Sequence, residues 1–334
     1  MAPRGKRAKI AATTPPASEL IAALKFVAVA QHATGQIYQT HCALGGGTVV
    51  AFDGTIAAGQ RINEDLTACP HTHRLIDALT KCGDSLAITQ IDNGRLSVKS
   101  GNFRAFVPCV ARDMLLAIQP DPPVAAIDDR LRTGFEIVGN LAADASEHVV
   151  TASILLQAGS MVATDRRVMI EYWHGIDLPP GIVLPKAGAA AVVKTKKPLV
   201  SFGFSENSAT FYFNDGSWIK SQLYSVAWPN ISRILDVSAN PLPLPDNFYA
   251  AVDAVSPFSE SDDLHFTDGF MRSHPVDGIG ATYEIAGLPA GVVYKAKHLK
   301  LVQPYIKTVD FSGKNGIAYF FGDNIRGAIT GVQP

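Results

Sequence analysis

A cluster of cysteine and histidine residues in the first third of the chain comes closest to a local metal-binding pattern. Cys69, His71 and His73 alternate along the sequence and Cys82 follows, so four groups of the kind that bind zinc are present. The first three would share a face only in an extended segment. Pro70 instead predicts the entry of a helix, where proline is well tolerated. We therefore expect no metal site here, with zinc binding as the alternative.

Three aspartates, Asp53, Asp165 and Asp268, could be imagined as an acid–base set. Each follows a strand-like run, and they recur at intervals close to a third of the chain, which predicts turn-forming residues in equivalent places of a repeat. The glycines at 45–47 precede a strand and not a helix, so they lack the geometry of a phosphate loop. No Gly-x-Ser-x-Gly or His-Glu-x-x-His pattern occurs. We expect a protein that is not an enzyme and has no cofactor; an enzyme with scattered site residues is the alternative.

The composition predicts a folded, multi-domain, cytoplasmic protein. The chain has 334 residues, of which 47 % are hydrophobic and 18 % charged, and this length fits two or three domains. No apolar run reaches the roughly 18 residues needed to span a bilayer, and the N-terminus lacks the apolar stretch of a signal peptide. Four irregularly spaced cysteines fit reduced thiols.

Two proline-rich passages, at 119–123 and 240–245, predict linkers, because proline lacks the amide donor that helices and central strands need. We expect a basic flexible tail and three domains, at residues 1–16, 17–122, 123–240 and 241–334.

Each predicted domain repeats one order of features: a helix, a strand ending in an aspartate turn, a second helix and a closing hairpin. Spacing near 3.6 residues predicts first helices at 18–34, 130–147 and 246–260, with Ser18 and Asp246 as caps. Second helices are expected at 71–82, 185–195 and 295–308, the last ended or kinked by Pro304. The closing hairpins turn at 101–102, 215–216 and 322–323. The pattern predicts an α+β fold of three tandem domains built on antiparallel sheets.

Some segments resemble the bacterial DNA polymerase III β subunit, or β sliding clamp, family in their amino-acid sequence as well as in the order of their predicted elements. Residues 94–108 are similar to the hairpin that closes that family's first domain. Residues 161–168 resemble its "VATDGHRL" signature with one residue fewer, and residues 222–235 its "LIDGRFPDYRRVLP" stretch. Sparse identity suggests a divergent member, of phage or other mobile-element origin.

The resemblance implies a homodimeric ring of six domains around duplex DNA, with helices lining the hole and sheets outside. Such a ring is a sequence-independent processivity factor that tethers DNA polymerase and the clamp loader. Lysine-rich second helices in a chain of net charge −1 agree with this reading, although lysines on helices can also be ordinary solvated faces. The expected DNA-facing residues are Lys25, Arg74, Lys81, Arg130, Arg132, Lys186, Lys194, Lys196, Lys197, Lys295, Lys297, Lys300 and Lys307.

The family resemblance also implies a cleft that accepts short partner peptides. Carried over by motif, its residues are Thr164, Arg167, Val168, Pro229, Arg233, Ile234, Ile329 and Val332. Two departures affect it: the family's Gly-His pair becomes the single Arg166, and its "PMRL" ending becomes residues 331–334, Gly-Val-Gln-Pro. Alternatively, these residues only pack a domain junction, and the chain is a repeat scaffold that never encircles DNA.

Overall fold

The computed structural model describes residues 17–83, 85–91, 94–144 and 146–332. The predicted basic tail, residues 1–16, and the last two residues lie outside them. The chain divides into two compact units, described separately below: one holds the residues up to Arg132 together with Ala187–Tyr224, the other Thr133–Lys186 and the residues from Ser225 onward. No helix in the described part combines the length and the apolar run that crossing a bilayer requires.

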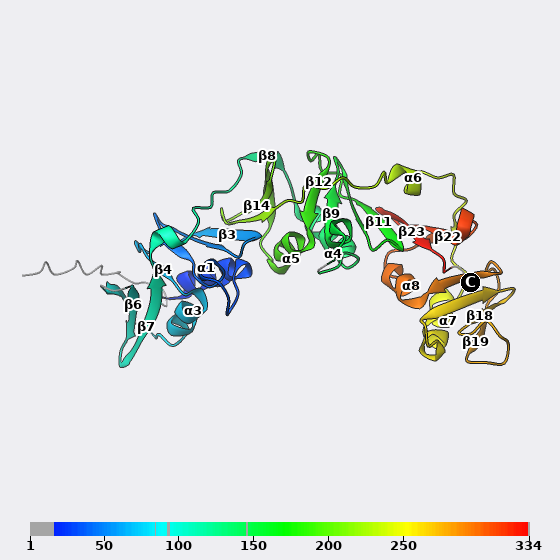
Figure 1. The fold of residues 1–334 in the computed structure, drawn as a ribbon, viewed down its shortest axis with the longest axis horizontal. Coiled ribbons are helices and arrows are strands. Elements are labelled where there is room, and N and C mark those ends of the chain that lie inside the picture. Colours follow the sequence, from blue (N-terminus) through cyan, green and yellow to red (C-terminus); the bar gives the residue numbers. More distant parts are fainter. Residues whose placement is uncertain (1–16, 84, 92–93, 145, 333–334) are drawn as a thin grey trace, which may run out of the picture. The chain divides into compact units, whose positions relative to one another are not determined.

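The first unit contains a seven-stranded antiparallel sheet in the order β1-β2-β3-β15-β14-β13-β8. Strands β3, β14 and β8 of this sheet are labelled in Figure 1. Strands from the first and second predicted domains meet at its centre, where Ile56–Gly59 pairs with residues 218–221. Helices α1 and α3 contact each other, and α1 packs on β2 and β3 through buried leucines such as Leu20 and Leu24. The strands are Ala43–Gly45 (β1), Thr48–Phe52 (β2), Ile56–Arg61 (β3), Trp218–Gln222 (β15), Ser208–Phe213 (β14), Leu199–Ser205 (β13) and Pro123–Ala126 (β8); the helices are Ser18–Val27 (α1), Ile37–Thr40 (α2), Thr72–Thr80 (α3) and, mostly in this unit, Lys186–Lys194 (α5).

A smaller sheet of the first unit has the order β4-β7-β6-β5. Its strands are Cys69–Pro70 (β4), Phe103–Val110 (β7), Arg95–Ser100 (β6) and Ala87–Ile91 (β5). One side of β7 pairs with β6 along residues 103–108, while β4 covers only Cys109 and Val110 on the other side. Within the described chain, most of β7 is therefore an open sheet edge.

The second unit contains an eight-stranded antiparallel sheet in the order β12-β9-β10-β11-β23-β22-β21-β16. Residues 168–172 of β11 pair with 325–329 of β23, which joins the second predicted domain to the third. Gly134 lets α4 lie close to this sheet, because a Cβ there would meet Met161 and Tyr172 at under 3 Å. The strands are Ile182–Pro185 (β12), Ser153–Leu156 (β9), Ser160–Thr164 (β10), Val168–Trp173 (β11), Ile325–Thr330 (β23), Ile317–Phe321 (β22), Thr308–Asp310 (β21) and Leu242–Pro243 (β16); the helices are Asp129–Gly139 (α4) and Ser232–Leu235 (α6).

A four-stranded sheet in the order β19-β18-β17-β20 completes the second unit. Its strands are Asp263–Thr267 (β17), Phe270–Arg272 (β18), Thr282–Glu284 (β19) and Val292–Lys295 (β20), and the helices Phe248–Val255 (α7) and Ala296–Val302 (α8) pack with it. An aromatic cluster of Phe248, Phe266, Tyr294 and Phe311 fills this core. The ring centroids of Phe248 and Tyr294 each lie within 6 Å of those of Phe266 and Phe311.

The tandem repeat is confirmed by strand order, but one expected landmark is wrong. Asp53 and Asp165 occupy equivalent turns, between β2 and β3 and between β10 and β11, where each carboxylate accepts two backbone N–H bonds. Asp268 lies one hairpin earlier in its meander, between β17 and β18. The equivalent connection in the third repeat is the longer segment 273–281. A Thr-Asp-Gly turn fits either hairpin, so only strand pairing distinguishes them.

All six expected helices are present, and each is shorter than predicted. Helix α1 continues past Val27 only as a 3₁₀ turn, and α8 ends at Val302, before Pro304. Neither expected cap is used: α1 begins after Ala17, and α7 begins after Asn247, which has φ 62°. The expected hairpin turns are confirmed, with Gly101 and Gly216 at positive φ.

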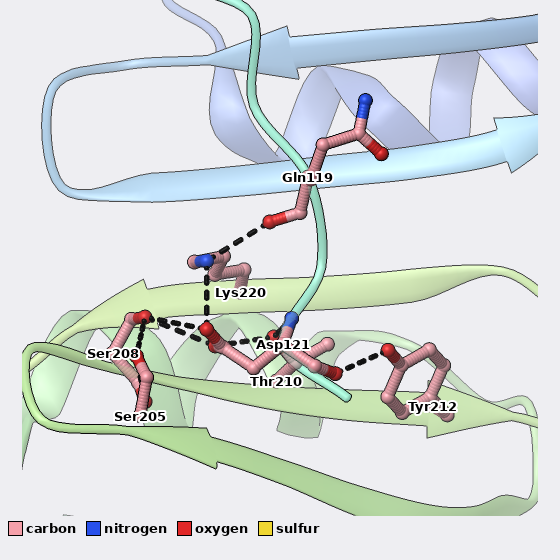
Figure 2. Close-up of polar contacts among 7 residues, drawn as sticks. All are labelled: Gln119, Asp121, Ser205, Ser208, Thr210, Tyr212 and Lys220. Carbon is pink, nitrogen blue, oxygen red and sulfur yellow. Dashed lines mark hydrogen bonds and ion pairs between the residues drawn. The ribbon is translucent and has the colours of Figure 1, made fainter. Parts of the chain in front are cut away.

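The first proline-rich passage is anchored to the seven-stranded sheet by a buried polar cluster (Figure 2). The Asp121 carboxylate, 5 % exposed, accepts hydrogen bonds from Ser208 and Thr210 and pairs with Lys220 Nζ at 2.9 Å. Tyr212 donates to the Asp121 carbonyl, and Lys220 donates to that of Gln119. Burial alone raises the pKa of Asp121, but these side-chain hydrogen bonds outweigh it and hold the pKa below its ordinary value. The passage is therefore fixed and, from Pro123, becomes strand β8.

Asp121→Asn should destabilise the first unit at neutral pH, because Lys220 then keeps a largely buried charge without its carboxylate. We expect a loss of about 2–3 kcal/mol in unfolding free energy. Stability from a lowered carboxyl pKa is present above the unfolded value of about 4 and is lost as pH falls through the folded value. The difference in unfolding free energy between variant and wild type, measured by urea unfolding, should therefore be smaller at about pH 3 than at neutral pH. Asp215→Asn, at a half-exposed ion pair with Lys197, is the control and should cost less. An equal loss at both pH values would contradict this account.

Candidate partner-binding surface

One face of the eight-stranded sheet carries an apolar surface covered by the segment that contains α6. Because side chains alternate along a strand, the register places Leu155, Val162, Met169 and Ala328 on this face. Leu235 is buried against them. The partly buried side chains packed on this floor are called the α6 patch: Trp228, Ile231, Ile234, Ile317 and Tyr319.

The structure separates the cleft residues expected from the sequence. Ile234 belongs to the α6 patch, and Thr164 lies on the same sheet face as Met169, its hydroxyl donating to the Val168 carbonyl. Val168 and Ile329 are register partners on the opposite face, each 1 % exposed in the core. Arg167, Pro229 and Arg233 are exposed, and Val332 is half-buried at the end of the described chain.

Sequence reasoning missed Trp228, Ile231, Ile317 and Tyr319. The sequence of β22, Ile-Ala-Tyr-Phe-Phe, is apolar throughout and carries no period-two signal, so only the structure separates partly buried Ile317 and Tyr319 from buried Ala318 and Phe320. Trp228 gave no signal either, because its place depends on a hydrogen bond from its indole N–H to Ser153 Oγ at 3.3 Å, far away in sequence.

At one end of this face lies the β10–β11 turn. Asp165 Oδ1 accepts the backbone N–H groups of Arg167 and Val168 at 2.8 and 2.7 Å, and Oδ2 lies 3.3 Å from Nε2 of buried His298 on α8. Burial raises the pKa of Asp165, but the hydrogen bonds from His298 and the turn outweigh it, so the pKa is below its usual value. The turn is therefore fixed from both the second and the third repeat.

At the other end, Arg326 ties the α6 segment to the sheet. Its Nε lies 2.8 Å from the buried Glu171 carboxylate, and Nη2 lies 2.7 Å from Asp236. Nη1 donates to the Leu235 carbonyl, and the guanidinium lies 5.0 Å from the Trp173 ring. Ser160 donates to the second Glu171 oxygen at 2.7 Å. This network holds the end of α6 on the sheet.

The expected DNA-facing cations fall into two groups. Several are paired with a carboxylate within 4 Å: Arg130 with Asp128, Arg132 with Asp129, Lys186 with Asp144, Lys197 with Asp215, Lys295 with Asp263, Lys300 with Asp253 and Lys307 with Asp323. Lys25, Arg74, Lys81, Lys194, Lys196 and Lys297 are exposed and have no such pair within the described chain.

The cysteine and histidine cluster has the geometry of a packed core. Cys69 lies in β4, His71 precedes α3, and the His41 and His71 rings lie 5.2 Å apart. Among the described residues, no group of three or more His, Cys, Asp or Glu side chains could hold a metal ion. Burial raises the pKa of the Cys42 thiol to about 12 and that of Cys109 to about 11, so these thiols stay protonated at neutral pH.

Comparison with known proteins places the fold. No protein-family model matches the chain, and no curated protein matches it. Solved structures do. A C. crescentus β sliding clamp is 15 % identical to this chain and superposes with a TM-score of 0.79. A Pseudomonas aeruginosa DNA polymerase sliding clamp is 14 % identical and superposes with a TM-score of 0.78. Each alignment covers 95 % of this chain and 98 % of the other. A Helicobacter pylori β clamp bound to a DNA ligase peptide is 16 % identical, with a TM-score of 0.76 over 94 % of this chain and 98 % of the other.

The chain therefore has the fold of a DNA sliding clamp. The chain is similar over nearly its whole length to the DNA polymerase III subunit beta from Pseudomonas aeruginosa, with 13 % identity and a TM-score of 0.76 over 95 % of this chain and 98 % of the other. None of these structures comes from a phage, so the expected phage origin gains no support from them.

Arg326→Leu should release the end of α6, because Glu171 then stays buried without its cation. We expect a loss of about 3 kcal/mol in unfolding free energy. Amide exchange should quicken at Leu235 and Asp236, whose N–H groups donate within α6. The double variant Arg326→Leu/Glu171→Leu removes the orphaned carboxylate and should recover much of the stability but not the slow exchange. A single variant as stable as wild type would refute this role.

Proposed function

We propose that the chain is a divergent DNA sliding clamp: a non-enzymatic processivity factor that encircles duplex DNA in the cytoplasm and tethers DNA polymerase. The observation that carries the proposal is the match of the whole fold, end to end, to proteins described as DNA polymerase sliding clamps. In this proposal the domains are residues 17–122, 123–240 and 241–334, and residues 1–16 are a basic tail.

The strand order supports a homodimer. Within the chain, the third strand of one meander pairs with the last strand of the following repeat: β3 with β15, and β11 with β23. The third repeat offers the corresponding strand β19, and the first repeat offers β7, and neither has its partner within the described chain. A second copy completes both junctions head to tail, with β7 of one copy beside β19 of the next.

The side chains near these two edges suit such a junction. Phe106 on β7 is 50 % exposed, and the guanidinium groups of Arg104 and Arg95 lie 4.7 and 5.7 Å from its ring centroid. Strand β19 carries the exposed Glu284. One edge therefore presents an aromatic side chain flanked by arginines, and the other presents a carboxylate, so the two edges are complementary in charge.

The unpaired cations supply the attraction to DNA. Lys194 and Lys196, at the end of α5 and just beyond, are exposed, as are Arg74 and Lys81 at α3. A ring that holds DNA by topology needs only such loose, sequence-independent phosphate contacts, which salt screens. The ion-paired lysines contribute less, because their charge is already partly neutralised.

The α6 patch is the proposed docking site for short peptides of the polymerase, the clamp loader and other partners. Its support is a strip of partly buried apolar side chains from the α6 segment and from β22, packed against the buried residues of the sheet and suited to two or three anchoring residues. The Helicobacter pylori clamp of the same fold is bound to a DNA ligase peptide. Binding several enzymes to one ring raises their effective concentration at the DNA.

Encirclement predicts that DNA ends matter. After loading with the cognate clamp loader and ATP, the protein should be retained on nicked circular DNA and lost from the same DNA once it is linearised. Retention on the circle should persist at high salt, since topology and not attraction holds the ring. Gel filtration of labelled protein with each DNA measures this. Equal retention on both forms would contradict encirclement and favour a repeat scaffold that binds only protein partners.

The head-to-tail junction predicts a dimer that depends on β7. Light scattering should give a mass near twice 35.6 kDa for the wild type. Phe106→Asp should shift it to the monomer at micromolar concentration, because a carboxylate replaces the exposed aromatic side chain at the junction. Leu116→Asp, at a 64 % exposed position of the same unit, is the matched control and should stay dimeric. A wild-type monomer, or a dimeric Phe106 variant, would rule out this junction.

A further inference from the structure

Arg166, at the apex of the β10–β11 turn, has a backbone conformation that its residue type does not explain. Its φ is 78°, in the left-handed region that favours glycine. The other non-glycine residues with positive φ in the described chain are Asn247, Asp262 and Asn315, types whose short polar side chains tolerate this region. A long arginine side chain gains nothing of that kind, so its presence indicates a role outside the turn.

The turn itself does not use the Arg166 side chain. Asp165 caps the N–H groups of Arg167 and Val168, and the Arg166 N–H donates to Thr164 Oγ1 at 3.0 Å. The Thr330 N–H donates to the Arg167 carbonyl at 2.8 Å. All of these bonds would survive with glycine at position 166.

The turn lies at the Trp228 end of the α6 patch. Val162 pairs with Leu155 in antiparallel β9 and β10, so Thr164 and Ser153, each two residues farther along its strand, lie at the same end of this ladder. Trp228 bonds to Ser153, so the indole lies over the corner of the sheet from which the turn projects. A peptide along the patch therefore passes the turn.

This end of the patch is cationic. Arg166 and Arg167 in the turn are exposed, and within the described chain neither has a carboxylate within 4 Å. The acid of the turn itself, Asp165, is engaged with His298.

We propose that Arg166 makes the α6 patch selective for extended peptides in which an aspartate or glutamate side chain flanks the apolar anchors. The inference rests on the proposed peptide-binding role of this patch. Attraction between exposed charges is modest, so the selectivity is a preference among apolar peptides and not the source of binding.

The test begins with a display library of random twelve-residue peptides selected on the full-length protein. Selected peptides that lose binding to an Ile234→Asp variant define the patch. One of them is synthesised with blocked termini, once with glutamate and once with glutamine at the flanking position. On wild type the glutamine version should bind about three- to fivefold more weakly, and the gap should close at high salt.

Arg166→Gly should abolish that difference while leaving the affinity for the glutamine peptide unchanged. Its thermal midpoint should equal or exceed that of the wild type, because glycine adopts the turn without strain. Arg166→Lys should keep part of the preference. An equal affinity for both peptides on wild type, or a preference that survives in Arg166→Gly, overturns the role of Arg166 and leaves the patch intact. Failure to select any peptide sensitive to Ile234→Asp overturns the docking site itself.

Discussion

The ladder between β11 and β23 is the constraint on which the second unit depends. Its hydrogen bonds join backbone groups of two repeats more than a hundred residues apart, and the β3–β15 ladder does the same in the first unit. Backbone bonding does not require particular side chains, and each position needs only the correct alternation of buried and exposed residues. Identities of 14–16 % to structures of the same fold are therefore compatible with an unbroken succession of sheets.

What could be predicted from the sequence was local. Gly101 and Gly216 mark hairpin turns because positive φ is a property of the residue and its neighbours, and the helix positions followed from apolar spacing. The predicted helices were too long because the helical spacing of apolar residues continues past the true helix end into 3₁₀ turns and strands, as it does after Val27. Asp268 was assigned to the wrong hairpin because strand order is decided by pairing, which no single turn encodes.

The candidate site was harder to predict because a motif does not say which way a side chain points. Val168 and Ile234 both belong to segments that resemble known clamp sequences, yet one lies in the core and the other in the α6 patch. A one-residue difference in position along a strand reverses the face. Ion pairing has the same dependence on tertiary structure: Lys197 meets Asp215, while Lys196 beside it meets no carboxylate among the described residues. Charge counts over a helix cannot separate the two.

The prolines of the two proline-rich passages have a further consequence for aggregation. Each passage contributes to the outermost strand at one side of a large sheet: β8 begins at Pro123, and β16 contains Pro243. An outermost strand normally presents free amide donors to any extended chain that approaches, whereas proline has none to offer. These residues thus make one edge of each large sheet a poorer template for stray strands, a safeguard against aggregation at that edge.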